Sequence, residues 1–212
     1  MCGDHLKKNL WQLVWDFCGI PFRFILFDQA WLSRFGWVTL EDERLSLILP
    51  HVKGRLLDIG CGTNTLVRRY RYGVGIDLYD HGGGALIVDN SAQLPFATRS
   101  FDTITFVACF NLIPYRTQVL SEAMRLLRPG GQLLITMINP IVGGIGYSTW
   151  WYVQDKVPFG RKTGVVRGLW TAEVVGLCKR AGFQLREHRR FLYNLNNFYR
   201  FEVGEVQEAM QN

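Results

Sequence analysis

A short loop that contains two glycines is the part of the chain best suited to hold a small charged ligand. It reads Asp58-Ile59-Gly60-Cys61-Gly62-Thr63-Asn64 and follows the apolar pair Leu56-Leu57. Glycines let the backbone turn tightly, and they let a ligand approach more closely than a Cβ atom would permit. Loops of this kind hold several classes of nucleotide. The loop therefore predicts a nucleotide-like ligand without deciding which one.

Two carboxylates narrow the choice of ligand. Asp58 comes two residues before the first glycine, where it would repel the pyrophosphate of a dinucleotide and attract an ammonium group. Position 65 is Thr, so the third glycine of the dinucleotide fingerprint is missing. Asp77 ends the next apolar stretch, where a carboxylate can accept hydrogen bonds from both ribose hydroxyls. Together these residues favour S-adenosylmethionine over a nicotinamide dinucleotide. The alternatives are that Asp58 only orders its own loop and that Asp77 is an exposed turn residue.

Short apolar stretches alternate with helical patterns around this loop. We expect strands at 55–59, 74–76, 85–88, 101–107 and 133–137, and helices at 65–70, 116–127 and 171–182, the last capped by Thr171. Residues 183–201 predict an antiparallel hairpin joined around 194–197. The alternation predicts an α/β fold, with a doubly wound, mostly parallel sheet that is covered on both faces. Ligands of such sheets bind beyond the carboxyl ends of the strands.

The segments before the first strand also have helical patterns. Residues 7–38 predict one or two aromatic-rich helices, interrupted near 19–21. Thr39 and Asp42 resemble a capping box, which predicts a helix that begins there and ends at Pro50.

Four motifs resemble, in order and spacing, those of class I S-adenosylmethionine-dependent methyltransferases. They are LLDIGCGTN, GVGID, LPFATRSFDTITF and LLRPGGQLLIT. The resemblance is strong over 52–137 and looser over 171–201, and it points to the small-molecule branch with the ubiquinone/menaquinone-type enzymes. It implies a Rossmann-like sheet of seven strands, six parallel and one antiparallel in the C-terminal hairpin. Where the family has its third loop glycine this chain has Asn64, a residue that tolerates a left-handed backbone.

The resemblance also implies which residues contact the cofactor. In the loop after the third strand, either Asp89 or Asn90 would accept the adenine amino group, and Cys109 would lie beside the methionine part. The predicted cofactor-binding residues are Asp58, Gly60, Cys61, Gly62, Asn64, Asp77, Leu78, Asp89, Asn90, Ser91 and Cys109.

Methyl transfer from a sulfonium needs alignment and a dry pocket more than it needs an acid or a base. None of the four His residues lies in a pattern typical of a general base, so no catalytic residue is assigned. Asn111 and Tyr147 are the candidates for contacts with the acceptor.

Composition limits the other function classes. The five Cys form no CxxC pair, which predicts reduced thiols in a cytoplasmic protein and no metal site. The net charge is +6, but the basic residues come in short runs, which argues against nucleic acid as a partner. The longest charge-free stretch, 129–154, is broken by Pro140 and three glycines, so we expect no membrane-spanning helix. Peripheral membrane contact stays open, and the oligomeric state is not predicted.

Two segments fall outside the pattern of the fold. We expect 1–38 to be an aromatic N-terminal helical extension, and 39–212 to be the methyltransferase domain with an insertion at 141–170. Both segments are rich in aromatic residues and could form a lid over the strand ends, with Gly143, Gly144 and Gly146 as hinges. Pockets of this kind favour an apolar or aromatic small molecule, quinone-like or lipid-like, whose acidic group Arg161, Lys162 and Arg167 would hold. The alternative is that these aromatic residues bury one another as extra core.

Three rival functions remain. They are a nicotinamide-dependent reductase, a nucleic-acid methyltransferase and a non-catalytic module that binds S-adenosylmethionine. The nucleic-acid enzyme is disfavoured because Asn111-Leu112-Ile113-Pro114-Tyr115 only loosely resembles an N-P-P-Y tetrapeptide.

Overall fold

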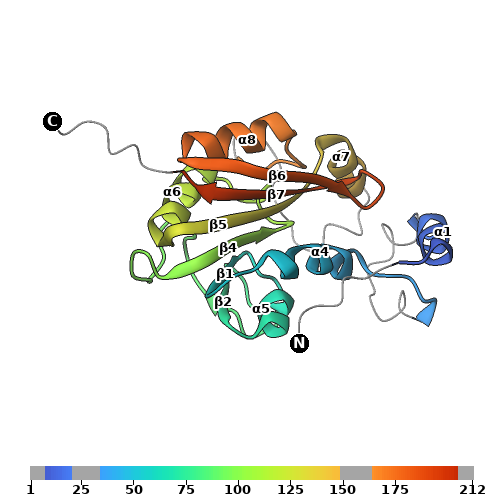
Figure 1. The fold of residues 1–212 in the computed structure, drawn as a ribbon, viewed down its shortest axis with the longest axis horizontal. Coiled ribbons are helices and arrows are strands. Elements are labelled where there is room, and N and C mark those ends of the chain that lie inside the picture. Colours follow the sequence, from blue (N-terminus) through green and yellow to red (C-terminus); the bar gives the residue numbers. More distant parts are fainter. Residues whose placement is uncertain (1–7, 21–33, 149–163, 205–212) are drawn as a thin grey trace.

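A seven-stranded sheet forms the centre of the computed structural model, which describes residues 8–20, 34–148 and 164–204 (Figure 1). The strand order is β3-β2-β1-β4-β5-β7-β6. Neighbouring strands are parallel, except that β7 runs antiparallel to both β5 and β6. The predicted doubly wound sheet with an antiparallel C-terminal hairpin is therefore confirmed. The strands are β1 (Leu56–Ile59), β2 (Gly73–Asp77), β3 (Leu86–Ile87), β4 (Phe101–Val107), β5 (Leu127–Ile138), β6 (Phe183–Phe191) and β7 (Asn196–Val203).

Helices cover both faces of the sheet. One face packs against α4 (Leu40–Ile48) and α5 (Thr65–Tyr70), the other against α6 (Arg116–Leu126) and α8 (Thr171–Arg180). Successive residues of a strand point to opposite faces. Accordingly, Leu56 is buried with Leu45 of α4, while Leu57 is buried with Leu120 of α6. All of β1 is buried, as expected for a central parallel strand.

The predicted start of α4 is confirmed. Thr39 is its N-cap, and the Thr39 hydroxyl oxygen accepts a hydrogen bond from the Asp42 N–H (3.0 Å) while its proton goes to the Asp42 carboxylate (2.7 Å). A single turn of 3-10 helix, Leu49–His51, then leads to β1.

Two predicted boundaries are wrong. The N-cap of α8 is Trp170, whose N–H donates to the Glu173 carboxylate (2.7 Å); the predicted cap, Thr171, is inside the helix and its hydroxyl pairs with that of Tyr199 (2.9 Å). The turn of the β6–β7 hairpin is at 192–195, not 194–197, because three consecutive residues, Leu192, Tyr193 and Asn194, have positive φ angles. This turn lets Asn196 and Asn197 enter β7 with their side chains buried.

The insertion predicted at 141–170 begins with a helix, α7 (Pro140–Ser148). The three glycines expected to be hinges lie inside this helix. Gly143 is buried, and a Cβ there would collide with the backbone carbonyl of Arg167. Gly143 therefore allows close packing of two segments, and the rest of the insertion up to residue 163 lies outside the described residues.

The carboxyl ends of the parallel strands lie at the right-hand end of the molecule in Figure 1, where α7 and the N-terminal helix α1 (Leu10–Cys18) also lie. Of the helices in the described ranges, none is both long and apolar enough to cross a membrane.

Candidate cofactor-binding site

The glycine loop leaves β1 in a left-handed conformation. Gly60, Gly62 and Asn64 have φ angles of +72°, +52° and +59°. The N–H groups of Gly60 and Cys61 both donate to the carbonyl of Ile76, at 2.9 and 3.0 Å, which ties the loop to β2. A Cβ at Gly62 would meet no atom within 4 Å, so this side of the loop is open. Asn64 does occupy the left-handed conformation expected of it.

The side chain of Asn64 points away from that opening. It is buried, and its amide nitrogen lies 3.4 and 3.3 Å from the carbonyl oxygens of Gly83 and Gly84. Asn64 therefore joins the glycine loop to the loop after β2, and its described contacts are with protein.

Asp58 is a buried carboxylate that lines a cleft. It follows Leu56 on the face of β1 that packs against α4, and it is 2% exposed. The hydroxyl of Thr105 on β4 donates to Asp58 Oδ1 at 2.6 Å. Burial raises the pKa of Asp58 to about 7. The hydrogen bond from Thr105 lowers this pKa in part, and the charge of Asp77 raises it slightly. A positive group in the cleft would relieve this cost of ionising Asp58.

The cleft next to Asp58 has a volume of about 270 Å³. It lies between the start of α4, the glycine loop, the first turn of α5 and the end of β4. The lining residues are Glu41, Arg44, Leu45, Asp58, Gly60, Cys61, Gly62, Thr63, Thr65, Leu66, Val107 and Ala108. The sequence did not predict the α4 residues as part of the site. The capping box predicts where α4 begins. It does not predict that the start of α4 lies beside the glycine loop.

Asp77 connects β2 to the glycine loop. Its Oδ2 accepts the N–H of Gly62 at 2.8 Å, and its Oδ1 accepts those of Leu78 and Tyr79 at 2.7 and 3.2 Å. His81 Nε2 lies 3.8 Å from the same Oδ1. A carboxylate has about four acceptor positions, so Asp77 keeps some capacity for a further donor.

The other predicted cofactor residues lie around this edge with different exposures. Leu78, Asp89 and Asn90 are exposed and Ser91 is half-buried. The side-chain oxygen of Asn90 already accepts the N–H of Ala92 at 2.8 Å, which leaves Asp89 the more available acceptor of the pair.

Two cysteines line the back of the glycine loop. The thiol of Cys109 lies 3.0 Å from the carbonyl of Ile59, and a Cβ at Gly60 would come within 2.8 Å of its sulfur. Burial raises the pKa of Cys109 well above its usual value and that of Cys61 to about 12. Both thiols are therefore protonated near neutral pH, and neither is suited to act as a nucleophile.

Of the two candidates for acceptor contacts, Asn111 is not among the described residues that line the cleft. Asn111 is buried. Its side-chain amide nitrogen donates to the Val166 carbonyl, and its backbone carbonyl accepts the Val166 N–H, both at 3.0 Å. Asn111 thus fastens 164–170 to the exit of β4. Tyr147 belongs to the last turn of α7, and its side chain lies outside the described part of the structure.

A larger hollow of about 550 Å³ lies on the outer surface between α6 and α8. Its lining residues come from those helices and the segments before them, and none comes from a strand. The smaller cleft is the better candidate, because it meets the carboxyl ends of β1 and β4, where ligands of doubly wound sheets bind.

The residues of the cleft fit S-adenosylmethionine. Asp58 offers a buried negative charge for its ammonium group, Asp77 offers a carboxylate for its ribose, and the open side of Gly62 leaves room for close approach.

Comparisons with known proteins give the same picture. A family model described as a methyltransferase domain matches residues 57–135. The demethylmenaquinone methyltransferase of Thermotoga maritima is 27% identical over 86% of this chain and 91% of its own length. The fatty-acid O-methyltransferase of Mycolicibacterium smegmatis is 34% identical over 47% of this chain. A SAM-dependent methyltransferase of Thermotoga maritima has the same fold, with a TM-score of 0.60 and 18% identity over 92% of this chain and all of that one.

Residues 57–135 therefore carry a methyltransferase domain with the class I fold, and such domains use S-adenosylmethionine as their cofactor. For some relatives, the aligned region covers only part of the relative's length. The chain covers 46% of the fatty-acid enzyme and 51% of a protein from Methanocaldococcus jannaschii, so it spans about half the length of these two.

Proposed function

We propose that the chain transfers a methyl group from S-adenosylmethionine to a small, largely apolar acceptor. The observation that carries the proposal is the pair of carboxylates at the open glycine loop, with Asp58 buried in the cleft and Asp77 bound to the Gly62 N–H. A dinucleotide would bring its pyrophosphate against the buried carboxylate, whereas the ammonium group of S-adenosylmethionine is attracted to it.

The protein contributes binding and alignment. Asp58 holds the ammonium group, Asp77 holds the ribose, and Asp89 accepts the adenine amino group. The bound cofactor supplies an electrophilic methyl group on a sulfonium. Glu41, Arg44 and Leu45 of α4 form one wall of the cleft. Asn111 acts by fixing 164–170 beside the exit of β4.

Two observations support an apolar acceptor. The relatives named above act, by their names, on a fatty acid and on demethylmenaquinone. In addition, the end of the molecule that carries the strand ends also carries exposed apolar side chains of α1 and α7, among them Trp11, Phe17 and Ile145. We extend the proposed acceptor site to the segments 1–38 and 141–170, whose described helices are α1 and α7.

Calorimetric titration tests the cofactor. S-adenosylmethionine and its demethylated product should both bind, with micromolar dissociation constants that correspond to about −7 to −9 kcal/mol. NAD and NADP should give no heat. Binding of a nicotinamide nucleotide with no heat from either sulfur compound would contradict the proposal.

Incubation with methyl-labelled cofactor tests the reaction. Label should enter quinol or fatty-acid acceptors and not DNA or RNA. A chain of the same fold, the [4+2]-cyclase SpnF (TM-score 0.61, 13% identity), shows that the fold alone does not define the reaction. Tight cofactor binding without label in any fraction of a cell extract would favour the non-catalytic alternative.

A further inference from the structure

The polarity of α1 is reversed relative to a helix on the surface of a globular protein. Such helices bury an apolar stripe and expose charge. In α1 the charged residue, Asp16, is 0% exposed and its carboxylate lies 2.6 Å from the Lys8 ammonium. The apolar side chains face outward instead, with Trp11 83% exposed and Leu10 75% exposed. The remaining exposed members are Leu13, Val14, Trp15 and Phe17.

The reversed helix is held in place by the rest of the protein. The Tyr193 hydroxyl, at the turn of the β6–β7 hairpin, donates to the Leu13 carbonyl at 2.7 Å, and its ring packs edge-on against Phe17. The Trp15 indole N–H donates to the Phe35 carbonyl at 2.8 Å. These contacts fix the orientation of α1, so its outward apolar face is a property of the fold.

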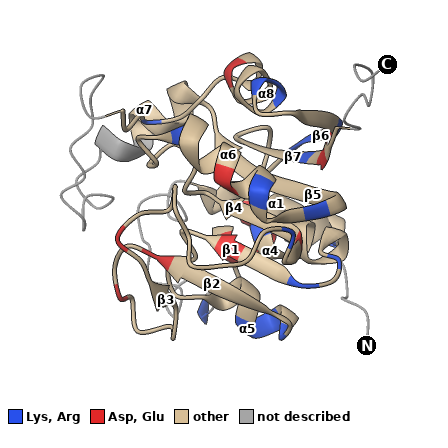
Figure 2. Cartoon of the chain, turned by 90° about the vertical axis from the view of Figure 1, so that its left-hand side faces the viewer, with Lys and Arg blue, Asp and Glu red and all other residues tan. Residues whose placement is uncertain are grey.

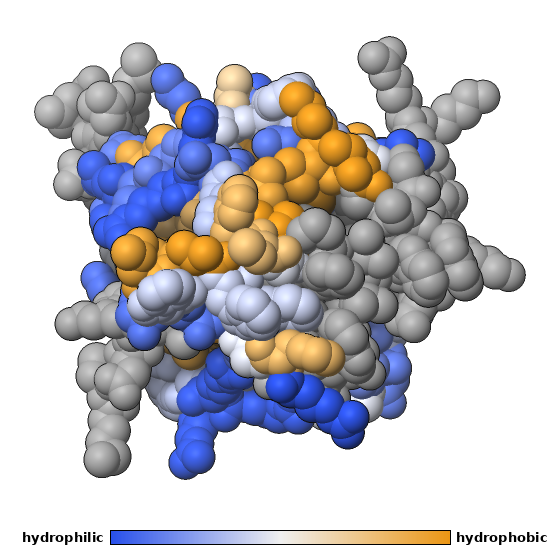
Figure 3. Space-filling model, turned by 90° about the vertical axis from the view of Figure 1, so that its right-hand side faces the viewer, coloured by the Kyte–Doolittle hydropathy of each residue, from blue (hydrophilic) through white to orange (hydrophobic). Residues whose placement is uncertain are grey.

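A second apolar face lies at the same end of the molecule. Ile141 and Ile145 of α7 are one helical turn apart, and they are 63% and 67% exposed. Figure 1 shows α1 and α7 both beyond the carboxyl ends of the strands. Figure 3 views this end directly and shows apolar side chains gathered across it, with hydrophilic ones toward the rims.

Charges of both signs lie near α1. The first turn of α4 carries Glu41, Asp42 and Glu43, of which Asp42 pairs with Arg69 and Glu43 with Lys8. Arg34 and Arg190 are exposed, the first one residue before Phe35 and the second three residues before Tyr193. The carboxylates closest to α1, those of Asp16 and Glu43, are both ion-paired with Lys8. Asp80 and Asp89 are also exposed at the carboxyl ends of the strands. They follow β2 and β3, which lie at the opposite side of the sheet from the β6–β7 hairpin.

We propose that this end of the molecule, with α1 and α7 foremost, docks on an anionic lipid surface. Helices that lie in a membrane interface combine an outward apolar face rich in Trp with nearby basic residues. The tryptophans Trp11 and Trp15 suit the boundary between headgroups and acyl chains, because each ring has an apolar body and a polar N–H. Arg34 and Arg190 would meet the lipid phosphates.

A second copy of the chain fits this surface less well. Symmetric dimers bring the same patch of both copies together, so the arginines of one copy would approach those of the other. The proposal does not depend on methyl transfer. If the proposed acceptor is apolar, however, docking would place the mouth of the cofactor cleft next to the lipid bilayer in which the acceptor is dissolved.

Sedimentation with vesicles tests the proposal. The full chain should sediment with vesicles of phosphatidylcholine and phosphatidylglycerol, less with phosphatidylcholine alone, and less as salt is raised. The double variant Trp11→Gln/Ile145→Gln should lose at least about fivefold in vesicle affinity. Arg34→Gln/Arg190→Gln should lose the preference for the anionic vesicles.

The matched control is Tyr72→Gln. Tyr72 is 58% exposed and comes just before β2, at the amino end of the strands and so at the opposite end of the molecule. Its variant should sediment like the parent chain. Circular dichroism and the affinity for S-adenosylmethionine, unchanged in all variants, show that the fold and the cleft are intact. Equal losses for the Tyr72 and Trp11/Ile145 variants would overturn the proposal, as would a dimer in light scattering that the Trp11/Ile145 variant abolishes. A parent chain that stays in the supernatant would also overturn it, even if the chain binds cofactor.

Discussion

At the scale of single residues, the two carboxylates of the cofactor cleft differ in how their charge is supported. Asp77 accepts three backbone N–H groups, which stabilise an anion. Asp58 accepts one hydroxyl from Thr105 and is buried, and its pKa is about 7. Ionisation of Asp58 therefore carries a cost of burial that a bound positive group would relieve, and this effect can be measured.

The first prediction concerns pH. The ammonium group of the cofactor favours ionised Asp58 and lowers its pKa, so binding below pH 7 should release a proton. The affinity for S-adenosylmethionine should then rise by up to about tenfold per unit between pH 5 and 7, and level off above. This range lies below that in which α-amino groups lose their proton. Titrations at pH 6 in buffers of different ionisation enthalpy would measure the proton release.

Two variants separate Asp58 from its neighbours. Asp58→Asn should bind weakly and without this pH dependence. His81→Gln should keep it, although His81 lies 3.8 Å from Asp77. If Asp58→Asn showed the slope of the parent chain, Asp58 would not be the group that pairs with the ammonium.

The second prediction concerns Asp77→Ala. This variant should weaken cofactor binding by about 1.5–3 kcal/mol, because hydrogen bonds to a charged acceptor are lost and the Gly62 N–H loses its partner. The fold should persist, since Asp77 is at a strand end. Asp80→Ala is the control: it removes the same charge three residues away, from an exposed side chain that caps the Gly82 N–H. Equal affinities of the two variants would show that Asp77 is only a turn residue.

At the scale of secondary-structure elements, the segment 164–170 connects α7 to the exit of β4. Asn111 holds it from the strand side through Val166, and Gly143 lets α7 approach its backbone at Arg167. The close approach requires glycine because any Cβ at position 143 would overlap a carbonyl group. The element is therefore held by two contacts that the sequence pattern does not reveal.

The third prediction compares two adjacent glycines of α7. Gly143→Ala should destabilise the protein by about 1–3 kcal/mol, because the new Cβ collides with the Arg167 carbonyl. Gly144→Ala should be neutral or stabilising by up to about 1 kcal/mol, since a Cβ there meets nothing within 4 Å and alanine favours a helix. Urea denaturation measures both. Similar values for the two variants would mean that α7 does not pack on 164–170 as described.

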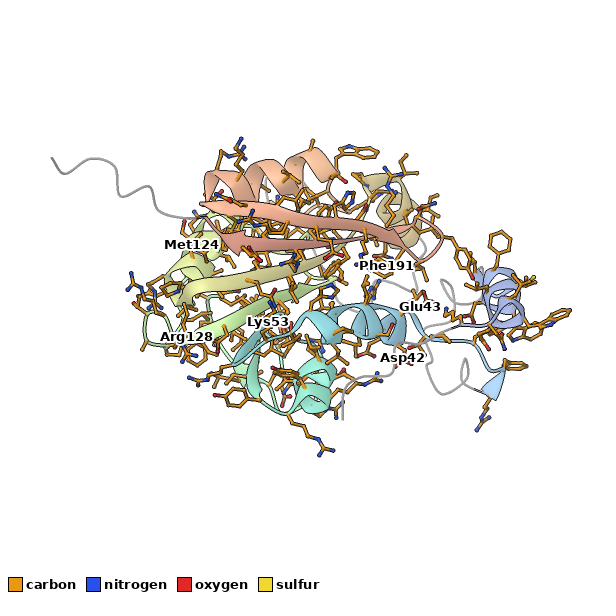
Figure 4. The ribbon with its side chains drawn as sticks, viewed as in Figure 1. Asp42, Glu43, Lys53, Met124, Arg128 and Phe191 are labelled. Atoms are coloured by element: carbon orange, nitrogen blue, oxygen red, sulfur yellow. The ribbon has the colours of Figure 1, made fainter. Side chains whose placement is uncertain are left out.

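At the scale of the whole molecule, ion pairs of Lys8 help to join α1 to the main domain. The Lys8 ammonium pairs with Asp16 of α1 and with Glu43 of α4. Figure 4 shows Asp42 and Glu43 at the end of α4 that faces α1, while Met124 and Arg128 lie at the opposite end of the molecule. Elsewhere the basic residues are dispersed: Figure 2 shows them on both α5 and α8, at opposite edges of the sheet.

The fourth prediction is that Lys8→Met releases α1. The variant removes the Lys8 ammonium from the buried Asp16 carboxylate, and breaking a buried ion pair in this way costs about 3–5 kcal/mol. Limited proteolysis should cut before Thr39 faster than in the parent chain, while the melting of the main domain changes little. Lys179→Met removes an exposed lysine of α8 and serves as the control. Unchanged proteolysis of Lys8→Met would show that the Lys8 pairs do not hold α1.

The sequence by itself determined the sheet, its doubly wound order and the place of the glycine loop. It also predicted that Asn64 could take the left-handed conformation, because a single residue's backbone preference decides this. These features depend on patterns of two to seven neighbouring residues, which local physics fixes. The cap of α4 belongs to the same group, since Thr39 and Asp42 bond to each other.

Only the tertiary structure decided what surrounds the loop. The partner of Asp58 is Thr105, 47 positions away, and residues of α4 form one wall of the cleft. It also decided the outward face of α1, because a helix pattern predicts burial of the apolar side, whereas here the buried side chain is Asp16. This orientation depends on contacts with other segments: Lys8 pairs with Asp16 and Glu43, and Tyr193 contacts Leu13. Contacts between distant segments follow from packing of the whole chain, because the local sequence around one residue does not predict its distant partner.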